Sequence, residues 1–215
     1  MGVFLCLVME RGIFMLILLL SFGLLNAQKM VKKSVHKPDT SSILIDADNC
    51  FKVEITTTLS KEIVVEALID GEYKNDLVIK IEEVGPSIEI STGFQPNFIK
   101  PNDKLSAHKV ISISLKVQLP ENMNVHLFGS NTNVYAKGSY KDLKVTLDDG
   151  TCNFQSINGI THALTRSGDI YVYSKGATIE TKNSFGSTEI GNIPKGADYF
   201  NLVTTTGNIY LKKTE

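Results

Sequence analysis

Apolar residues recur at every second position over most of the chain after residue 42, and this alternation constrains the fold more than any other feature. The longest run comprises Ile111, Ile113, Leu115, Val117 and Leu119. Side chains alternate between the two faces of a β-strand, so a period of two predicts strands with one buried and one solvated face. No segment after residue 27 shows a sustained helical period. We therefore predict an all-β protein.

Between residues 42 and 120, polar turn sequences separate the alternating segments. Asp70-Gly71 and Gly85-Pro86 are typical of tight turns. Short turns of this kind favour an antiparallel β-sheet or sandwich with one solvated face. Residues 28–41 are polar, with four lysines and a proline, and they predict a flexible leader in front of the sheet.

After residue 120, glycines mark expected corners at a regular interval: Gly129, Gly150, Gly168, Gly186 and Gly207. Their spacings are 21, 18, 18 and 21 residues. A fixed period of this kind predicts a β-solenoid, whose rungs of about 18–21 residues stack around a continuous core. We expect residues 121–215 to form it, continuous with the antiparallel region of residues 42–120 as one domain. A continued sandwich with coincidental glycine spacing is the alternative.

The register within the repeats predicts which side chains point inward. The residues two and four positions after a corner should line the core, with Val134 joining them on the first repeat: Cys152, Ile170, Thr188 and Ile209, then Phe154, Val172, Ile190 and Leu211.

The intervening positions should point outward and place four tyrosines on one exposed sheet: Tyr135, Tyr171, Tyr173 and Tyr210. Tyrosine combines an apolar ring with a polar tip, which suits binding surfaces and sugar stacking. We therefore treat these residues as a candidate binding face. The alternative is that tyrosine serves there as a strand former that packs laterally between repeats.

Residues 12–25 form an uncharged apolar run, GIFMLILLLSFGLL. Fourteen residues are short for a bilayer span, which takes about 20, but they match the apolar region of a secretory signal. The small residue Ala27 ends the following segment, so we expect cleavage between Ala27 and Gln28 and no membrane span afterwards. Translation could start at Met1 or Met9. An uncleaved anchor is the alternative.

Charge and cysteine content exclude several classes of protein. The chain has 22 basic and 23 acidic residues, which leaves no basic excess for a nucleic-acid partner. Three cysteines exclude a disulfide-dense scaffold and a four-cysteine zinc site. Cys50 belongs to the first sheet and Cys152 to an inward core position, so we expect them to be unpaired. The four histidines show no zinc-ligand spacing, and we expect no metal and no cofactor: His36, His108, His126 and His162.

Three carboxylates beside glycine corners, Asp148, Asp149 and Asp169, are the best candidates for catalysis. They would suit a carbohydrate-active β-helical enzyme, either a polysaccharide lyase or a hydrolase, which needs an acid and a base or nucleophile at a defined separation. Asp beside Gly is more typical of a turn. The chain also lacks a Gly-x-Ser-x-Gly elbow, a phosphate loop and a dinucleotide fingerprint. We therefore expect no catalytic residues and a protein that is not an enzyme.

The segment at 91–108, STGFQPNFIKPNDKLSAH, is long for a hairpin connection. Long loops with apolar tips can be binding elements. The alternative, which we favour, is that Phe94 and Phe98 fold back over the end of the sheet.

Several of these segments resemble the putative adhesin family and its relative, the auto-transporter adhesin head domain family. The resemblance rests on the signal peptide, on ISISLKVQLPENMNVHLFGS at 111–130, and on the related GDIYV at 168–172 and GNIYL at 207–211. It covers about residues 42–215. It implies an exported, β-helical bacterial protein of the periplasm, the outer membrane or the cell surface. It further implies a structural or interaction module, with a glycan or another envelope protein as partner, and it offers no active-site residue to carry over.

Overall fold

The computed structural model describes residues 28–99 and 111–214. Within these ranges every regular element is a β-strand, which confirms the all-β class, and all the strands belong to one mixed sheet. The strands are β1 (Lys29–Val35), β2 (Ser42–Asp46), β3 (Lys52–Thr58), β4 (Ile63–Gly71), β5 (Leu77–Val84), β6 (Ser87–Phe94), β7 (Ile111–Pro120), β8 (Met123–Thr165), β9 (Asp169–Ser174), β10 (Ala177–Asn183), β11 (Thr188–Ile190), β12 (Asp198–Thr204) and β13 (Ile209–Lys213).

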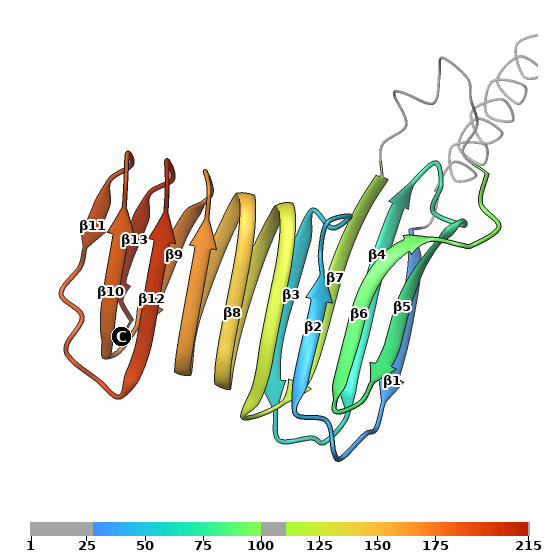
Figure 1. The fold of residues 1–215 in the computed structure, drawn as a ribbon, viewed down its shortest axis with the longest axis horizontal. Helices are drawn as coiled ribbons and strands as arrows, with labels where there is room; N and C mark the ends of the chain where they lie inside the picture. Colours follow the sequence, from blue (N-terminus) through green and yellow to red (C-terminus); the bar gives the residue numbers. More distant parts are fainter. Residues whose placement is uncertain (1–27, 100–110, 215) are drawn as a thin grey trace, which may run out of the picture.

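The strands lie in two facing rows along the long axis of the molecule (Figure 1). The front row follows the order β5–β6–β2–β8–β12–β10, and the back row follows β1–β4–β7–β3–β8–β9–β13–β11. Strand β8 belongs to both rows, because residues 124–128 pair with β2 and residues 133–137 pair with β3. The apolar side chains between the rows form one core that includes residues from both halves of the chain.

Pairing directions in the first half differ from the antiparallel arrangement that we expected. The pairs β1–β4, β4–β7 and β5–β6 are antiparallel. Strands β2 and β3, however, pair in parallel with each of their neighbours. The reason is that some short turns join the two rows. The turn after Asp70-Gly71 leads from β4 in the back row to β5 in the front row, so it creates no hairpin.

The expected flexible leader is also wrong for most of its length. Residues 29–35 form β1, which pairs with β4 along its whole length. Lysine ammonium groups of β1 donate hydrogen bonds to backbone carbonyls of β5: Lys29 Nζ to Leu77 O at 2.9 Å and Lys33 Nζ to Ile79 O at 2.7 Å. The lysines that suggested disorder therefore satisfy acceptors on a strand at the end of the front row.

The repeats at the C-terminal end stack in an order that differs from their order in the sequence. Strand β12 lies between β8 and β10, and β13 lies between β9 and β11. The last repeat is therefore inserted inside the preceding one. Glycine corners show the same order, because a Cβ on Gly207 would collide with the carbonyl oxygen of Gly168, and one on Gly186 with that of Gly207.

Most of the predicted inward residues are buried: Val134, Cys152, Phe154, Ile170, Val172, Ile209 and Leu211. The prediction is wrong for Ile190, which is 75% exposed, and Thr188 is only half-buried. Both residues belong to β11, which pairs only with β13 within the described part of the chain. A core position in the last strand of a row has a neighbour on one side only.

The aromatic residues of the segment at 91–108 fold back as we favoured. The rings of Phe94 and Phe98 stack with their centroids 4.2 Å apart, and Tyr73 packs edge-on against both. Phe94 also packs against the core. Ile99 is 86% exposed. Residues 100–108 of this segment, His108 among them, lie outside the described residues, as does the apolar N-terminus with Ala27.

Candidate binding surfaces

The four outward tyrosines of the sequence prediction lie on the outer side of the back row. Tyr171 is in register with Tyr210 on one side and with Asn153 on the other. Tyr173 follows on β9, and Tyr135 lies on β8 in register with Glu54 of β3. We call Tyr135, Asn153, Tyr171, Tyr173 and Tyr210 the tyrosine face.

Tyr171 and Tyr210 form the most ordered part of the tyrosine face. Their rings stack with centroids 4.7 Å apart and planes within 11° of each other. This is the lateral packing that the alternative interpretation predicted, and both residues are half-buried. Tyr135 is 39% exposed, and the ammonium group of Lys52 lies 5.1 Å from its ring centroid.

A hydrogen bond holds the hydroxyl group of Tyr171 within this pair. Tyr171 Oη donates to Asp169 Oδ2 at 3.4 Å. Partial burial, followed by the negative charge of Asp169, raises the pKa of Tyr171, so its hydroxyl stays protonated and can donate. Asp169 Oδ1 accepts hydrogen bonds from the backbone N–H of Asn208 at 2.7 Å and from its side chain at 3.2 Å. The surface is therefore organised before any ligand arrives.

Each of the three candidate catalytic carboxylates already has a partner within the protein. Asp148 lies 3.7 Å from Arg166 in an exposed ion pair, and Asp149 Oδ1 accepts the backbone N–H of Gly150 at 2.7 Å. Asp169 is held by Asn208 as described above. Each carboxylate thus stabilises a turn or a neighbouring repeat, in line with the turn interpretation. Residues 28–99 and 111–214 contain no cluster of histidine, cysteine or carboxylate side chains suited to a metal ion.

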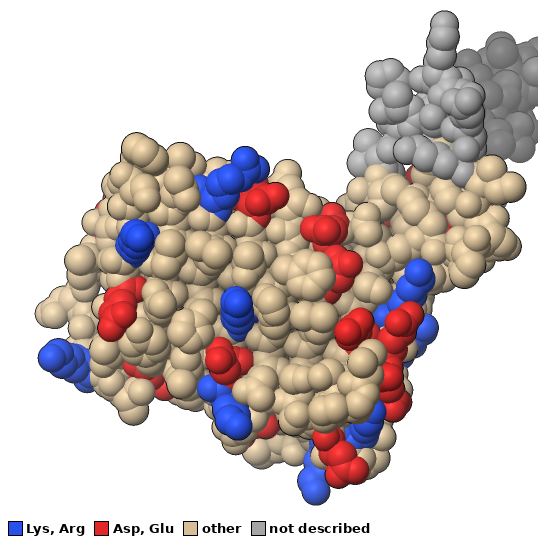
Figure 2. Space-filling model, in the orientation of Figure 1, with Lys and Arg blue, Asp and Glu red and all other residues tan. Residues whose placement is uncertain are grey.

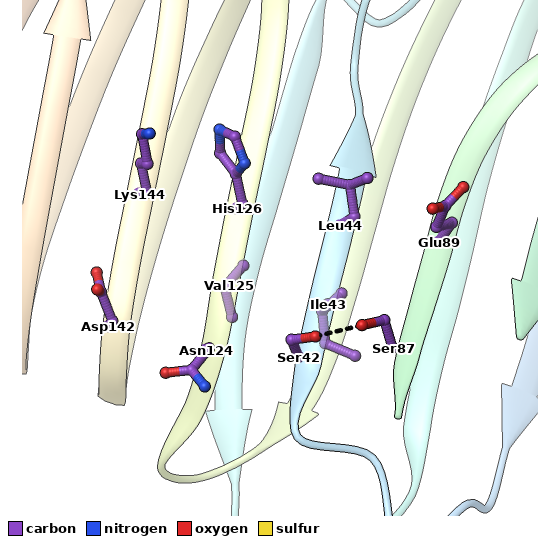
Figure 3. Close-up of a pocket in the computed structure, with 10 residues that line it drawn as sticks. All are labelled: Ser42, Ile43, Leu44, Ser87, Glu89, Asn124, Val125, His126, Asp142 and Lys144. Carbon is purple, nitrogen blue, oxygen red and sulfur yellow. Dashed lines mark hydrogen bonds between the residues drawn. The ribbon is translucent and has the colours of Figure 1, made fainter. Parts of the chain in front are cut away.

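A second surface, which the sequence did not predict, is a cleft of about 320 Å³ on the outer side of the front row. Figure 3 shows how β6, β2 and two passes of β8 contribute to it, with Asp142 and Lys144 on one pass and His126 on the other. We call it the front cleft. The hydroxyls of Ser42 and Ser87 are hydrogen-bonded across it at 2.6 Å.

Charges of both signs meet in the front cleft. The Oδ1 atom of Asp142 is buried and has no hydrogen-bond partner among the described residues. Partial burial, and then the nearby Lys144, lower the pKa of His126, although Asp142 opposes this shift. His126 points outward, as its place in the alternation predicts. The cleft itself escaped prediction because its residues are far apart in the sequence and meet only through the parallel registers.

Elsewhere, the outer side of the front row carries basic and acidic side chains interspersed (Figure 2). Cys50 and Cys152 are buried, free thiols. In the part of the chain that the structure describes, no helix has the length and apolar character needed to cross a membrane.

Comparisons with known proteins show which fold the chain shares. No protein-family model matches it, and no curated protein gives a significant match. A putative cell adhesion protein from Clostridium sporogenes ATCC 15579 is 16% identical, with a TM-score of 0.61 over 87% of this chain and 100% of that one. The chain therefore has the all-β fold of that protein.

Two other solved structures are more distant. A putative adhesin from Bacteroides fragilis NCTC 9343 is 10% identical, with a TM-score of 0.38 over 86% of this chain and 98% of that one. A putative adhesin from Parabacteroides merdae ATCC 43184 is 12% identical, with a TM-score of 0.30 over 87% and 97%. At these scores neither adds to the description of the fold.

Proposed function

We propose that this protein is an exported, adhesin-like interaction module that binds a glycan through the tyrosine face. The observation that carries the proposal is the stacked Tyr171–Tyr210 pair on the outer side of a regular strand row. Aromatic rings with hydroxyl tips supply apolar contact and hydrogen bonds at a small cost in conformational entropy. Asn153, in register with Tyr171, adds an amide group for sugar hydroxyls.

The finer architecture in this proposal is a β-solenoid whose rungs hold the tyrosine face rigid. Its support is the parallel register between repeats. Thr151 is paired with Asp169, 18 residues later, and Ile170 is paired with Ile209, 39 residues later. The second offset equals one repeat of 18 and one of 21, which fits a last rung inserted inside its predecessor. Rigid presentation favours binding because little ordering is needed.

Export is supported by the apolar run at 12–25 and by the small residue Ala27. We place the module in the periplasm, at the outer membrane or on the bacterial surface, as the family resemblance and the name of the clostridial protein suggest. N-terminal sequencing of the protein from the envelope fraction should begin at Gln28. Recovery of a membrane-bound protein with its leader intact would contradict export with cleavage.

The carbohydrate-active enzyme remains the alternative, but no observation favours it. Its three candidate carboxylates are engaged in turn hydrogen bonds or in an exposed ion pair. A glycan that the protein binds without altering it is therefore the ligand we propose.

The test is a glycan array probed with the wild-type protein and with a Tyr171→Ser/Tyr210→Ser variant. We expect the double variant to lose at least about tenfold in affinity, because truncated aromatic anchors typically cost more than 1 kcal/mol each. Tyr199→Ser is the matched control, since Tyr199 lies on the front row and its loss should leave binding unchanged. A folded double variant that retains full binding would exclude the tyrosine face. A wild-type protein that binds no glycan would exclude the ligand class.

A further inference from the structure

The sheet edges at the two ends of the molecule differ in how they are covered. At the N-terminal end, ammonium groups of Lys29, Lys33 and Lys37 donate to backbone carbonyls on or next to β5, the last of them to Gly85 O at 2.8 Å. Lysine at a sheet edge is a known device against further strand pairing. At the C-terminal end, β10 and β11 each pair with a single strand within the described residues (Figure 1).

The connection at 191–197 protects only the beginning of β10. Ala177 N–H donates to Pro194 O at 2.9 Å, and Thr178 Oγ1 lies 3.4 Å from Gly196 O. Ile193 packs against the edge of the core. Among the described residues, no hydrogen bond from this connection reaches residues 179–183, so the rest of β10 presents a sheet edge.

The core is also incomplete at this end. Thr181 is in register with the fully buried Leu202, yet it is exposed. Ile190 is in register with Leu211, which is 5% exposed, yet it is 75% exposed itself. The hydrogen bond of 3.0 Å from Asn183 Nδ2 to Ser187 O sets the end of β10 and the start of β11 at the same height. Thr181 and Ile190, each two residues in from this turn, therefore lie at similar heights on the two rows.

We propose that two copies of this chain join end to end here, around a two-fold axis that is normal to both rows and passes near Thr181 and Ile190. Strand β10 would pair antiparallel with the partner's β10 about Thr181. This register places Glu180 opposite the partner's Lys182, and Lys182 opposite the partner's Glu180. The edge is thus complementary in charge to a second copy of itself, and Ile190 is covered by the partner's Ile190.

The arrangement closes as a dimer because a two-fold axis brings the same C-terminal edge of both copies together. In the front row, a head-to-tail contact would require β10 to pair with β5, where the carbonyls of Leu77 and Ile79 already accept hydrogen bonds from lysines. A self-complementary contact uses the same surface on both copies, so the assembly stops at two copies and does not grow into a filament. An exposed pair of strands is a ready template for such pairing.

The direction of the axis has a functional consequence that rests on the proposed function. A two-fold axis normal to the rows keeps both back rows on the same side. The two tyrosine faces would then form one platform with Tyr210 of each copy near the joint. A surface that carries repeated glycans would be bound bivalently, which raises the overall affinity without any new contact.

The test is the mass of the purified protein by sedimentation velocity and light scattering across a concentration series. We expect a dimer for the wild type. Lys182→Glu and Glu180→Lys each place two like-charge pairs opposite one another, and each should weaken the dimer by about tenfold or more. The double swap Glu180→Lys/Lys182→Glu restores both opposite-charge pairs and should restore the dimer. Lys137→Glu, an exposed lysine of the back row, is the matched control and should stay dimeric.

Circular dichroism and thermal melts establish that each variant is folded. A wild-type protein that is monomeric throughout the series would overturn the proposal. So would filaments, or a dimer that all the charge variants leave unchanged. Glycan binding by a monomer would leave the tyrosine face intact and remove only the dimer, so the two proposals fail separately.

Discussion

The inserted order of the last two repeats can be tested with one pair of alanine substitutions. Leu211 and Ile190 are register partners at equivalent inward positions of neighbouring strands. Leu211 lies between Val172 and Ile190 and is 5% exposed, whereas Ile190 has one neighbour and is 75% exposed. If the repeats stacked in sequence order, Ile190 would lie between Val172 and Leu211, and Leu211 would be the exposed residue.

The expected costs follow from these burials. Leu211→Ala removes an almost fully buried side chain and should lower the free energy of unfolding by about 3 kcal/mol. Ile190→Ala removes a side chain with only a quarter of its surface buried, so its cost should be about 0.5–1 kcal/mol. In a domain of this size these values correspond to losses in Tm of roughly 6–12 °C and roughly 1–4 °C.

Urea unfolding followed by circular dichroism measures both values, at low protein concentration so that association contributes nothing. Leu202→Ala and Thr181→Ala repeat the comparison in the front row, where we expect about 3 kcal/mol and less than about 0.5 kcal/mol. If Ile190→Ala costs as much as Leu211→Ala, the inserted order is wrong and the repeats stack as they occur in the sequence.

The remaining predictions concern titratable groups in the core and in the front cleft. Burial raises the pKa of Cys50 to about 11 and that of Cys152 to about 12, so both thiols should resist alkylation at pH 8 in the folded protein and react in urea. Fewer than two reactive thiols in denatured, unreduced monomer would contradict their separation. Burial and Lys144 lower the pKa of His126, so the unfolded chain takes up this proton at a higher pH than the folded one. Stability should therefore fall as the pH drops below the ordinary histidine value of about 6.5; His126→Asn should reduce the loss of urea midpoint between pH 7.5 and pH 5.5, and an unchanged loss would refute this cause.

Local physics made the strands and most of the core predictable. Alternation depends only on which face of a strand each side chain occupies, so Phe154 and Val172 could be placed in the core from sequence alone. The glycine spacing was equally informative, because a corner without room for a Cβ requires glycine in each repeat. Gly168 meets this condition against the carbonyl oxygen of Gly150.

What the sequence did not reveal was which repeat neighbours which. Ile190 and Leu211 occupy equivalent places after their glycines, and nothing local distinguishes a buried repeat from a terminal one. One signal was available. The repeat at 177–190 carries Thr181 and Thr188 at inward positions where the last repeat carries Leu202 and Ile209. Polar residues at core positions are typical of a capping repeat.

The leader and the front cleft escaped prediction for a related reason. Lys29 and Lys33 suggested disorder because charged side chains are normally solvated. Their ammonium groups instead donate hydrogen bonds to carbonyl groups of β5, more than forty residues away in the sequence. The residues of the front cleft likewise meet only through pairings such as Ser42 with Ser87 and Ser42 with Asn124. Contacts at such separations depend on the complete topology, which no single segment encodes.

The inserted order is the one that hydrophobic burial favours. The last repeat contributes four large apolar side chains to the core, and each is at most 5% exposed: Phe200, Leu202, Ile209 and Leu211. Full burial of such a side chain stabilises the fold by about 1.5–3 kcal/mol. In the last strands of the two rows, these residues would lose a large part of this burial free energy. The repeat with Thr181 and Thr188 buries less apolar surface, so its position there costs less.

The entropic cost of the connection between β11 and β12 opposes the inserted order. Residues 191–197 must carry the chain back past the start of β10, and loop-closure entropy grows by only about 0.6 kcal/mol for each doubling of loop length. The free energy gained by burying the apolar side chains, several kcal/mol, therefore exceeds the entropic cost of the longer connection. The same balance leaves Ile190 at the edge of the back row, where the proposed second copy would give it the second neighbour that Leu211 already has.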